Sequence, residues 1–179
     1  MNTDLFFTIY DLTGRAPWLN KIVFFVAQHL DNVMIAIIAI ALVAFFIHDK
    51  DWRPRRFHVW LYEVFAIGCG TVGAWLIAVT VKAIVAAPRP FVIFSQVQPL
   101  VVETPYTSFP SGHATVFFAL AMAVYMYHKK LGYFFFICAF LISLSRVMAG
   151  VHYPVDVIFG AAIGIFIAWL STTFFQKKV

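Results

Sequence analysis

The segment VWLYEVFAIGCGTVGAWLIAVTV, residues 59–81, is an apolar run that contains a single charged residue, Glu63. A helix needs about 20 apolar residues to cross the hydrocarbon core of a membrane, and this segment has that length. The whole chain of 179 residues is 63% hydrophobic and 12% charged, whereas about a quarter of the residues in soluble domains are charged. The sequence therefore predicts a polytopic, all-α membrane protein whose residues 1–179 form a single membrane-embedded domain.

Further apolar runs predict the other helices of this bundle. The first of them is brief and is followed by Asp31 and Asn32, which we expect in an outer loop. Met1–Leu12 alternates between polar and apolar residues and is expected to lie along the membrane interface. We predict about six transmembrane helices, namely Val59–Val81 together with Ile22–Leu30, Val33–Ile47, Ala114–Tyr127, Leu131–Ala149 and Val155–Phe175.

Most basic residues lie in short segments between the apolar runs. They occur in 48–58, in 128–130 and in the tail 176–178, and the predicted helices place all three segments on one face. Cytoplasmic loops carry an excess of Lys and Arg, so the long loop 83–112 is assigned to the opposite, periplasmic or external, face. The net charge of +5 therefore reflects membrane topology, and we do not expect nucleic-acid binding.

Three cations near the outer face are not explained by topology: Lys82, Arg89 and Arg146. Lys82 directly follows the apolar run Val59–Val81. Arg89 comes about two helical turns later, beside prolines that break the helix. Both side chains can therefore point into one pocket. An arginine forks onto two phosphate oxygens, while a lysine supplies a compact charge. The alternative for Lys82 and Arg89 is snorkelling to the membrane interface.

The motif PSGH, residues 110–113, opens another apolar run. The start of a helix offers backbone N–H groups and the positive end of the helix dipole to an anion. Ser111 adds a hydroxyl donor, and Gly112 lets the backbone approach closely. We interpret the motif as a helix start that binds an oxyanion, and an ordinary Ser/Gly turn is the alternative.

The motif SRVMAGVHYPVD, residues 145–156, supplies the reactive group. Pro154 suits the first turn of a helix, which places His152 just before that helix and Asp156 in its opening turn. Asp156 can then orient one nitrogen of His152 and leave the other as a nucleophile. His113 is suited to protonate a departing oxygen. These groups can transfer a phosphoryl group without a metal, whereas an Asp–His pair that only fixes a loop is the alternative.

Several other residues are open to simpler interpretations. Glu103 and Tyr106 lie in the outer loop, where they either contact a substrate head group or are solvated. Trp75 lies in the middle of a span and is expected to pack there. Gly160 and Gly164 form a small-xxx-small pair, which predicts close helix packing.

In order and spacing, Lys82–Arg89–Pro90, PSGH and SRVMAGVHYPVD resemble the three signatures of the type-2 phosphatidic acid phosphatase superfamily. Each motif alone is short, but the set is specific, and it extends from Lys82 to Asp156. The resemblance implies a membrane lipid phosphatase with these roles: phosphate binding by Lys82, Arg89, Arg146, Ser111 and the Gly112 backbone, a phosphohistidine on His152, Asp156 as its partner, and His113 as the acid for the leaving group and then the base for water.

Within this superfamily, the short chain is most similar to small bacterial undecaprenyl-diphosphate phosphatases. The resemblance implies a lipid diphosphate substrate, no cofactor and no metal, and a multi-pass protein of the bacterial inner membrane whose site faces outward. Phosphatidylglycerol phosphate, phosphatidic acid and lipid A phosphates are alternative substrates, because relatives that act on them share the motifs. A lipid phosphotransferase would use the same residues. A lipid-binding or transport protein without turnover is the remaining alternative, although it would need no nucleophile.

Overall fold

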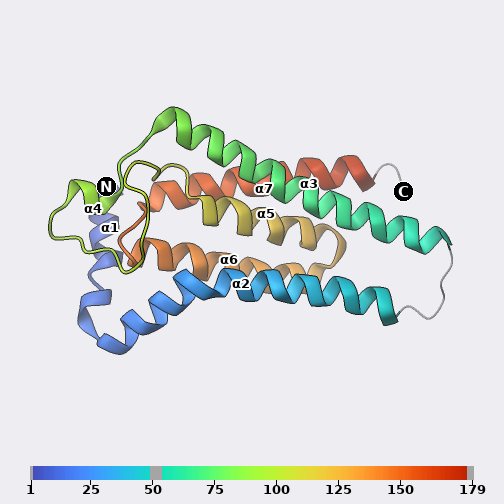
Figure 1. Cartoon of the computed structure of the whole chain (residues 1–179), viewed down its shortest axis with the longest axis horizontal. Helices are drawn as coiled ribbons and strands as arrows, with labels where there is room; N and C mark the ends of the chain where they lie inside the picture. The colour runs from blue at the N-terminus through green and yellow to red at the C-terminus, as the bar shows by residue number, and fades with distance from the viewer. Residues whose placement is uncertain (1, 49–53, 177–179) are drawn as a thin grey trace.

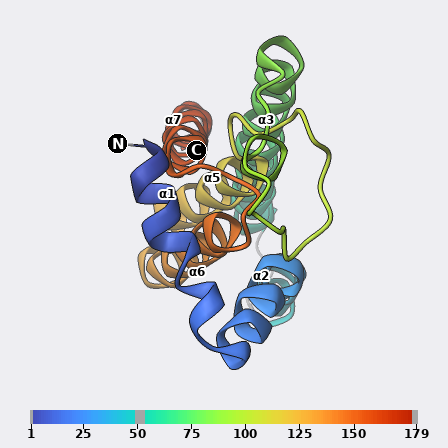
Figure 2. The same cartoon turned by 90° about the vertical axis from the view of Figure 1, so that its left-hand side faces the viewer.

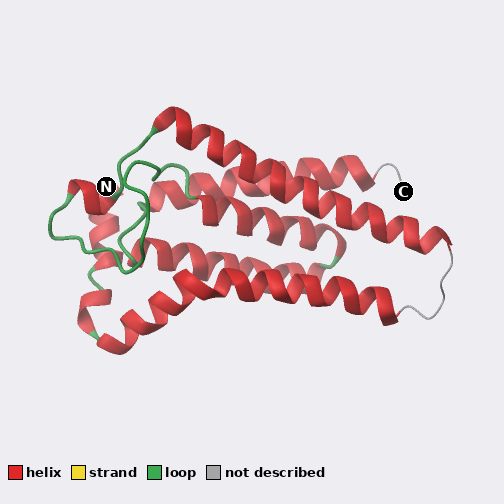
Figure 3. Ribbon diagram, in the orientation of Figure 1, coloured by secondary structure: helices red, strands yellow, loops and turns green. Residues whose placement is uncertain are grey.

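The computed structural model describes residues 2–48 and 54–176, and every regular element in this part of the chain is a helix (Figure 3). The all-α class is therefore confirmed. In chain order the elements are α1 (Asn2–Tyr10), the 3-10 turn η1 (Thr13–Arg15), α2 (Pro17–His48), α3 (Pro54–Val85), α4 (Pro90–Ile93), α5 (Gly112–Tyr127), α6 (Lys129–Met148) and α7 (Pro154–Gln176).

Four helices, α2, α3, α6 and α7, are long and apolar enough to cross a membrane. The predicted spans Val59–Val81, Leu131–Ala149 and Val155–Phe175 correspond to the last three of them. The α5 helix has 16 residues. At about 1.5 Å per residue it is roughly 24 Å long, which is shorter than the roughly 30 Å hydrocarbon core. The chain is thus a membrane protein, and its described residues form four long apolar helices and one shorter one.

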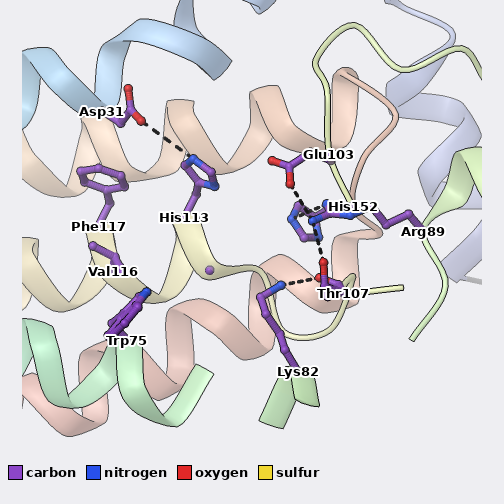
Figure 4. Close-up of a pocket in the computed structure, with 11 residues that line it drawn as sticks. Asp31, Trp75, Lys82, Arg89, Glu103, Thr107, His113, Val116, Phe117 and His152 are labelled. Atoms are coloured by element: carbon purple, nitrogen blue, oxygen red, sulfur yellow. Dashed lines mark hydrogen bonds and ion pairs between the residues drawn. The ribbon is translucent and has the colours of Figure 1, made fainter. Parts of the chain in front are cut away.

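The prediction of a separate sixth span from Ile22–Leu30 is wrong. This segment and Val33–Ile47 belong to the single helix α2, which continues through Asp31 and Asn32. In a helix interior, Asp and Asn each cost less than about 1 kcal/mol relative to alanine, whereas proline costs about 3 kcal/mol. Two such residues therefore do not end a helix that is held by packing. The expected outer loop at Asp31 does not form, and the Asp31 side chain points toward α5 instead (Figure 4).

The α5 helix lies at the centre of the bundle, where it packs against α3, α6 and α7 (Figure 2). On α7, Gly160 and Gly164 face α5. A Cβ atom added to Gly160 would lie 2.7 Å from the Ser111 carbonyl oxygen, and one added to Gly164 would lie 2.2 Å from that of Thr115. The predicted packing role of these glycines is confirmed. Their contact holds the start of α5 against the first turns of α7.

The two ends of the bundle differ in what they carry (Figure 1). The end of α2, the start of α3, the α5–α6 turn and the end of α7 lie together at one end, so the described parts of the three basic segments (residues 48, 54–58, 128–130 and 176) share that end. Residues 49–53 and 177–179 of these segments lie outside the described residues. The loops 86–111 and 149–153 lie at the opposite end, where α1 packs against α6 and α7 (Figure 2). Met1 of the expected interfacial segment also lies outside the described residues.

Candidate active site

A pocket of about 330 Å³ lies at the loop end of the bundle, beside the start of α5 and between residues of α2 and α3 (Figure 4). Five of the predicted site residues line it, namely Lys82, Arg89, Gly112, His113 and His152. The other three, Ser111, Arg146 and Asp156, are buried and contact or adjoin the lining residues. The structure thus brings all three sequence motifs to one place.

Lys82 and Arg89 reach the pocket from the two sides of the break after α3. Lys82 lies in the last turn of α3, and its Nζ donates to the carbonyl oxygen of Thr107. Arg89 is 3% exposed. Its Nη1 donates to the Val151 carbonyl at 2.8 Å, and its Nε donates to the Thr104 carbonyl at 2.7 Å. Both cations point into the protein, so snorkelling does not explain them.

Glu103 joins two of the predicted phosphate-binding arginines. Arg89 Nη2 donates to Glu103 Oε2 at 2.9 Å, and Arg146 Nη2 donates to the other carboxylate oxygen, Oε1. Arg146 is 2% exposed, and its Nη1 also donates to the Ala27 carbonyl at 3.0 Å. A carboxylate between two guanidinium groups resembles a phosphate in charge and in acceptor geometry. Neither interpretation of Glu103 from sequence, a head-group contact or a solvated residue, describes this bridge.

Ser111 is the N-cap of α5, so the predicted helix start is confirmed. Its Oγ accepts a long hydrogen bond of 3.5 Å from the Ala114 N–H. The Ser111 N–H donates to the main-chain oxygen of Asp156 at 2.9 Å, which links the start of α5 to the first turn of α7. Gly112 follows at the pocket wall, where an added Cβ would lie 3.6 Å from the Lys82 side chain. The hydroxyl of Ser111 as a phosphate donor stays a prediction.

His152 and Asp156 form the pair that their spacing predicts. Asp156 Oδ2 lies 3.5 Å from His152 Nδ1. The same oxygen accepts from Ser108 Oγ at 2.5 Å and from the Tyr153 N–H at 2.9 Å, which fixes the carboxylate. On the other side of the imidazole, His152 Nε2 lies 3.1 Å from Arg89 Nη1. The carboxylate thus faces one nitrogen of His152, and the second nitrogen lies beside the guanidinium group of Arg89.

The surroundings of His152 keep its imidazole neutral. Burial lowers the pKa of His152 well below its ordinary value, and the positive charges of Arg89 and Arg146 lower it further, although Asp156 acts in the opposite direction. A neutral imidazole has a free lone pair on one nitrogen. With the N–H directed toward Asp156, that lone pair is on Nε2, the nitrogen on the side of Arg89.

His113 enters the same pocket from the first turn of α5. Its side chain is 31% exposed, and its Nε2 lies 3.9 Å from Asp31 Oδ2 (Figure 4). Trp75 also lines the pocket, together with Val116 and Phe117 of α5. The prediction that Trp75 only packs within a span is wrong. These three apolar side chains adjoin the charged groups, so one pocket has both a charged part and an apolar part.

The sequence matches the PAP2 superfamily over residues 63–179. The chain belongs to this superfamily. The PAP2 protein is 30% identical to two relatives: bacitracin transport permease protein BcrC of Bacillus licheniformis (96% of this chain, 81% of the relative) and undecaprenyl-diphosphatase BcrC of Bacillus subtilis strain 168 (97% and 84%). Its fold is similar to that of Aquifex aeolicus LpxE, with a TM-score of 0.73 and 26% identity over 96% of this chain and 94% of that one.

The resemblance seen in the three motifs is therefore confirmed. The protein is a PAP2 membrane lipid phosphatase, and thus a hydrolase. The two acids that line the pocket, Asp31 and Glu103, carried no motif signal, and neither did Ser108, which donates to Asp156. For Glu103, the only hint in the sequence is its position in the loop that contains Arg89, on a face with an excess of unexplained cations.

Proposed function

We propose that this PAP2 phosphatase hydrolyses undecaprenyl diphosphate, or a similar polyprenyl diphosphate, to the monophosphate. The observation that carries the proposal is the composition of the pocket. Cationic and imidazole side chains form one part of it, and Trp75, Val116 and Phe117 adjoin them. A compact diphosphate on a long apolar chain matches both parts. The similarity to a relative named undecaprenyl-diphosphatase supports this substrate.

In the proposed reaction, His152 Nε2 attacks the terminal phosphorus of the diphosphate. A bond forms between this nitrogen and phosphorus while the bond from phosphorus to the bridging oxygen breaks, and His113 donates a proton to that oxygen. Water then attacks the phosphohistidine and transfers a proton to His113. Inorganic phosphate leaves, and His152 regains its lone pair. The 3.1 Å contact between His152 Nε2 and Arg89 supports this assignment, since it places the nucleophile beside a phosphate-binding cation.

The transferred phosphoryl group takes the place of the Glu103 carboxylate between Arg89 and Arg146. Lys82 and the backbone N–H groups at the start of α5 add positive charge around it. These groups neutralise the charge that develops on the phosphoryl oxygens, so the reaction needs no divalent metal ion. Vanadate adopts the five-coordinate geometry of the transition state and should inhibit.

We place the site on the periplasmic or external face of a bacterial inner membrane. The basic segments at the other end of the bundle support this orientation through the positive-inside rule. A variant in which Cys69 and Cys138 are replaced should serve as a background for single cysteines in the loop 95–107. An impermeant thiol reagent should label these cysteines in intact cells, and labelling only after permeabilisation would reverse the orientation.

Two alternatives use the same pocket differently. A phosphotransferase would pass the phosphoryl group from His152 to a second lipid, and the same residues would serve. A transport role has the name of the Bacillus licheniformis relative in its favour, but transport requires no nucleophile. The paired and enclosed His152 and Asp156 therefore favour catalysis over transport.

The decisive experiment measures phosphate release from a panel of lipids in detergent micelles. Undecaprenyl diphosphate should have a higher kcat/KM than phosphatidic acid or phosphatidylglycerol phosphate, and excess EDTA should leave the rate unchanged. Protein with His152→Ala, purified in the same way, controls for contaminating phosphatases. A clear preference for a lipid monophosphate would contradict the substrate. Transfer of the phosphoryl group to an added lipid alcohol, in place of phosphate release, would favour the phosphotransferase.

A further inference from the structure

His113 has a carboxylate neighbour of its own, supplied by a helix that contains no sequence motif. Asp31 lies within α2, and its Oδ2 is 3.9 Å from His113 Nε2. The other carboxylate oxygen, Oδ1, accepts from the Asn32 N–H at 2.7 Å, which fixes the orientation of the carboxylate. Figure 4 shows Asp31 on one side of the His113 ring and the group of Lys82 and His152 on the other side.

A charged carboxylate at the position of Asp31 costs free energy unless it has a partner. It lies in a helix long and apolar enough to span a membrane, and a charged residue at membrane depth is expensive without a partner or a polar cavity. Asp31 lines the pocket, and its side chain is 25% exposed. Among the described residues, the ion-pair partner of Asp31 is His113.

The charges around His113 show what such a carboxylate would do. Lys82 from α3 and Arg89 from the loop line the same pocket, and positive neighbours disfavour a protonated imidazole. Glu103, the other acid of the pocket, is bonded to Arg89 and Arg146. Asp31 is therefore the acid of the pocket that lies next to His113, and a negative charge at 3.9 Å favours the protonated form that a general acid needs.

We propose that Asp31 is a positioning residue for His113, as Asp156 is for His152. This inference rests on the proposed function of His113. Asp31 holds the Nε2–H of the imidazole on the α2 side, so that Nδ1 faces the leaving oxygen. When the bond from phosphorus to this oxygen breaks, the Nδ1 proton moves to the oxygen, and Nδ1 later takes a proton from the attacking water. The site then contains two carboxylate–imidazole pairs, one for each half of the reaction.

The test compares two leaving groups in a single preparation of Asp31→Asn. An alkoxide needs a proton more than a phosphate does, because it is the stronger base. The kcat/KM for phosphatidic acid should fall about tenfold, whereas that for undecaprenyl diphosphate should fall by less than about threefold. The ratio of the two does not depend on the folded fraction. Asp31→Glu, which keeps the charge, should restore part of the ratio.

A matched control removes a similar pair at the other end of the bundle. Glu63 Oε2 lies 3.5 Å from His128 Nε2, and Glu63→Gln should leave the substrate ratio unchanged. In a His113→Ala background, Asp31→Asn should have no further effect on the ratio. Equal losses of kcat/KM for both substrates would overturn the proposal. So would a double variant in which the effects of Asp31→Asn and His113→Ala on the substrate ratio multiply. Failure of the proposed function has a different signature that is seen in the wild-type protein alone, which would then prefer phosphatidic acid or hydrolyse neither lipid.

Discussion

The two histidines of the pocket have contrasting surroundings. His152 is 1% exposed, and its partner Asp156 is held by two further donors. The side chain of His113 is 31% exposed, and Asp31 lies 3.9 Å from it. One imidazole is thus enclosed and fixed on both sides, whereas the other is open to the pocket and guided from one side.

This difference fits the two chemical tasks that we propose. A nucleophile has to meet phosphorus along one line, and a fixed orientation lowers the barrier of that step. An acid–base group serves first the leaving oxygen and then a water molecule, which lie in different places. It therefore needs access to the pocket more than it needs rigidity. Each prediction below tests one side of this contrast.

The largest effect is expected from His152→Ala. Loss of the nucleophile should lower kcat by about 10⁵-fold or more, which is the scale seen when a covalent catalyst is removed. Rapid acid-free quenching of the wild-type reaction should trap acid-labile phosphate on His152. His29→Ala, an imidazole removed from α2 outside the pocket, is the control and should keep full activity. Turnover by the His152→Ala variant would contradict the covalent mechanism.

Asp156→Asn tests whether the enclosed imidazole depends on its carboxylate. An asparagine oxygen can still accept from Ser108 and from the Tyr153 N–H, so the fold should persist. The imidazole would lose its charged partner, and kcat should fall by about 10³- to 10⁴-fold. Phosphate release and the thermal melting temperature of the variant provide the measurements. A kcat within tenfold of wild type would show that Arg89 and burial alone orient His152.

His113→Ala tests the open imidazole. The loss of kcat for phosphatidic acid should be about 10²- to 10³-fold, the usual contribution of a general acid. The loss for undecaprenyl diphosphate should be smaller, because its departing phosphate is a weaker base than an alkoxide. Parallel assays with both lipids give the comparison. Equal losses would mean that His113 does not act on the leaving group.

The smallest effect is expected from Glu103→Gln, which alters the anion next to the enclosed histidine. The uncharged glutamine amide would leave more of the positive charge of Arg89 and Arg146 available to an anion. Vanadate should therefore bind about tenfold more tightly, which is a change of about 1.4 kcal/mol in its binding free energy. The inhibition constant for vanadate is the measurement, and Glu63→Gln at the far end serves as the control. Weaker binding of vanadate would instead show that Glu103 holds the arginines in place for the phosphate.

Much of the fold could be predicted because its signals are local. Hydropathy over about 20 residues marks the long helices, and proline marks the start of α7 at Pro154. The i, i+4 spacing of His152 and Asp156 places them together whatever the rest of the chain does. Ser111 caps α5 through contacts within three residues. Local signals predict α2 wrongly. Asp31 and Asn32 are residue types common at helix ends, so a separate sixth span was expected there, whereas α2 continues through both residues.

The amino-acid sequence by itself determined the membrane-spanning character, the superfamily and the residues of its three motifs, because each of these depends on neighbours in the chain. Only the tertiary structure placed Asp31 beside His113 and Glu103 between Arg89 and Arg146. Asp31 lies on α2 and His113 on α5. Glu103 lies in the loop and Arg146 on α6, so the packing of α2 and of the loop against α6 decides which side chains meet. Asp31 and Glu103 are acids in segments whose local sequence offers them no obvious partner. Each is stabilised by a basic side chain from another part of the fold.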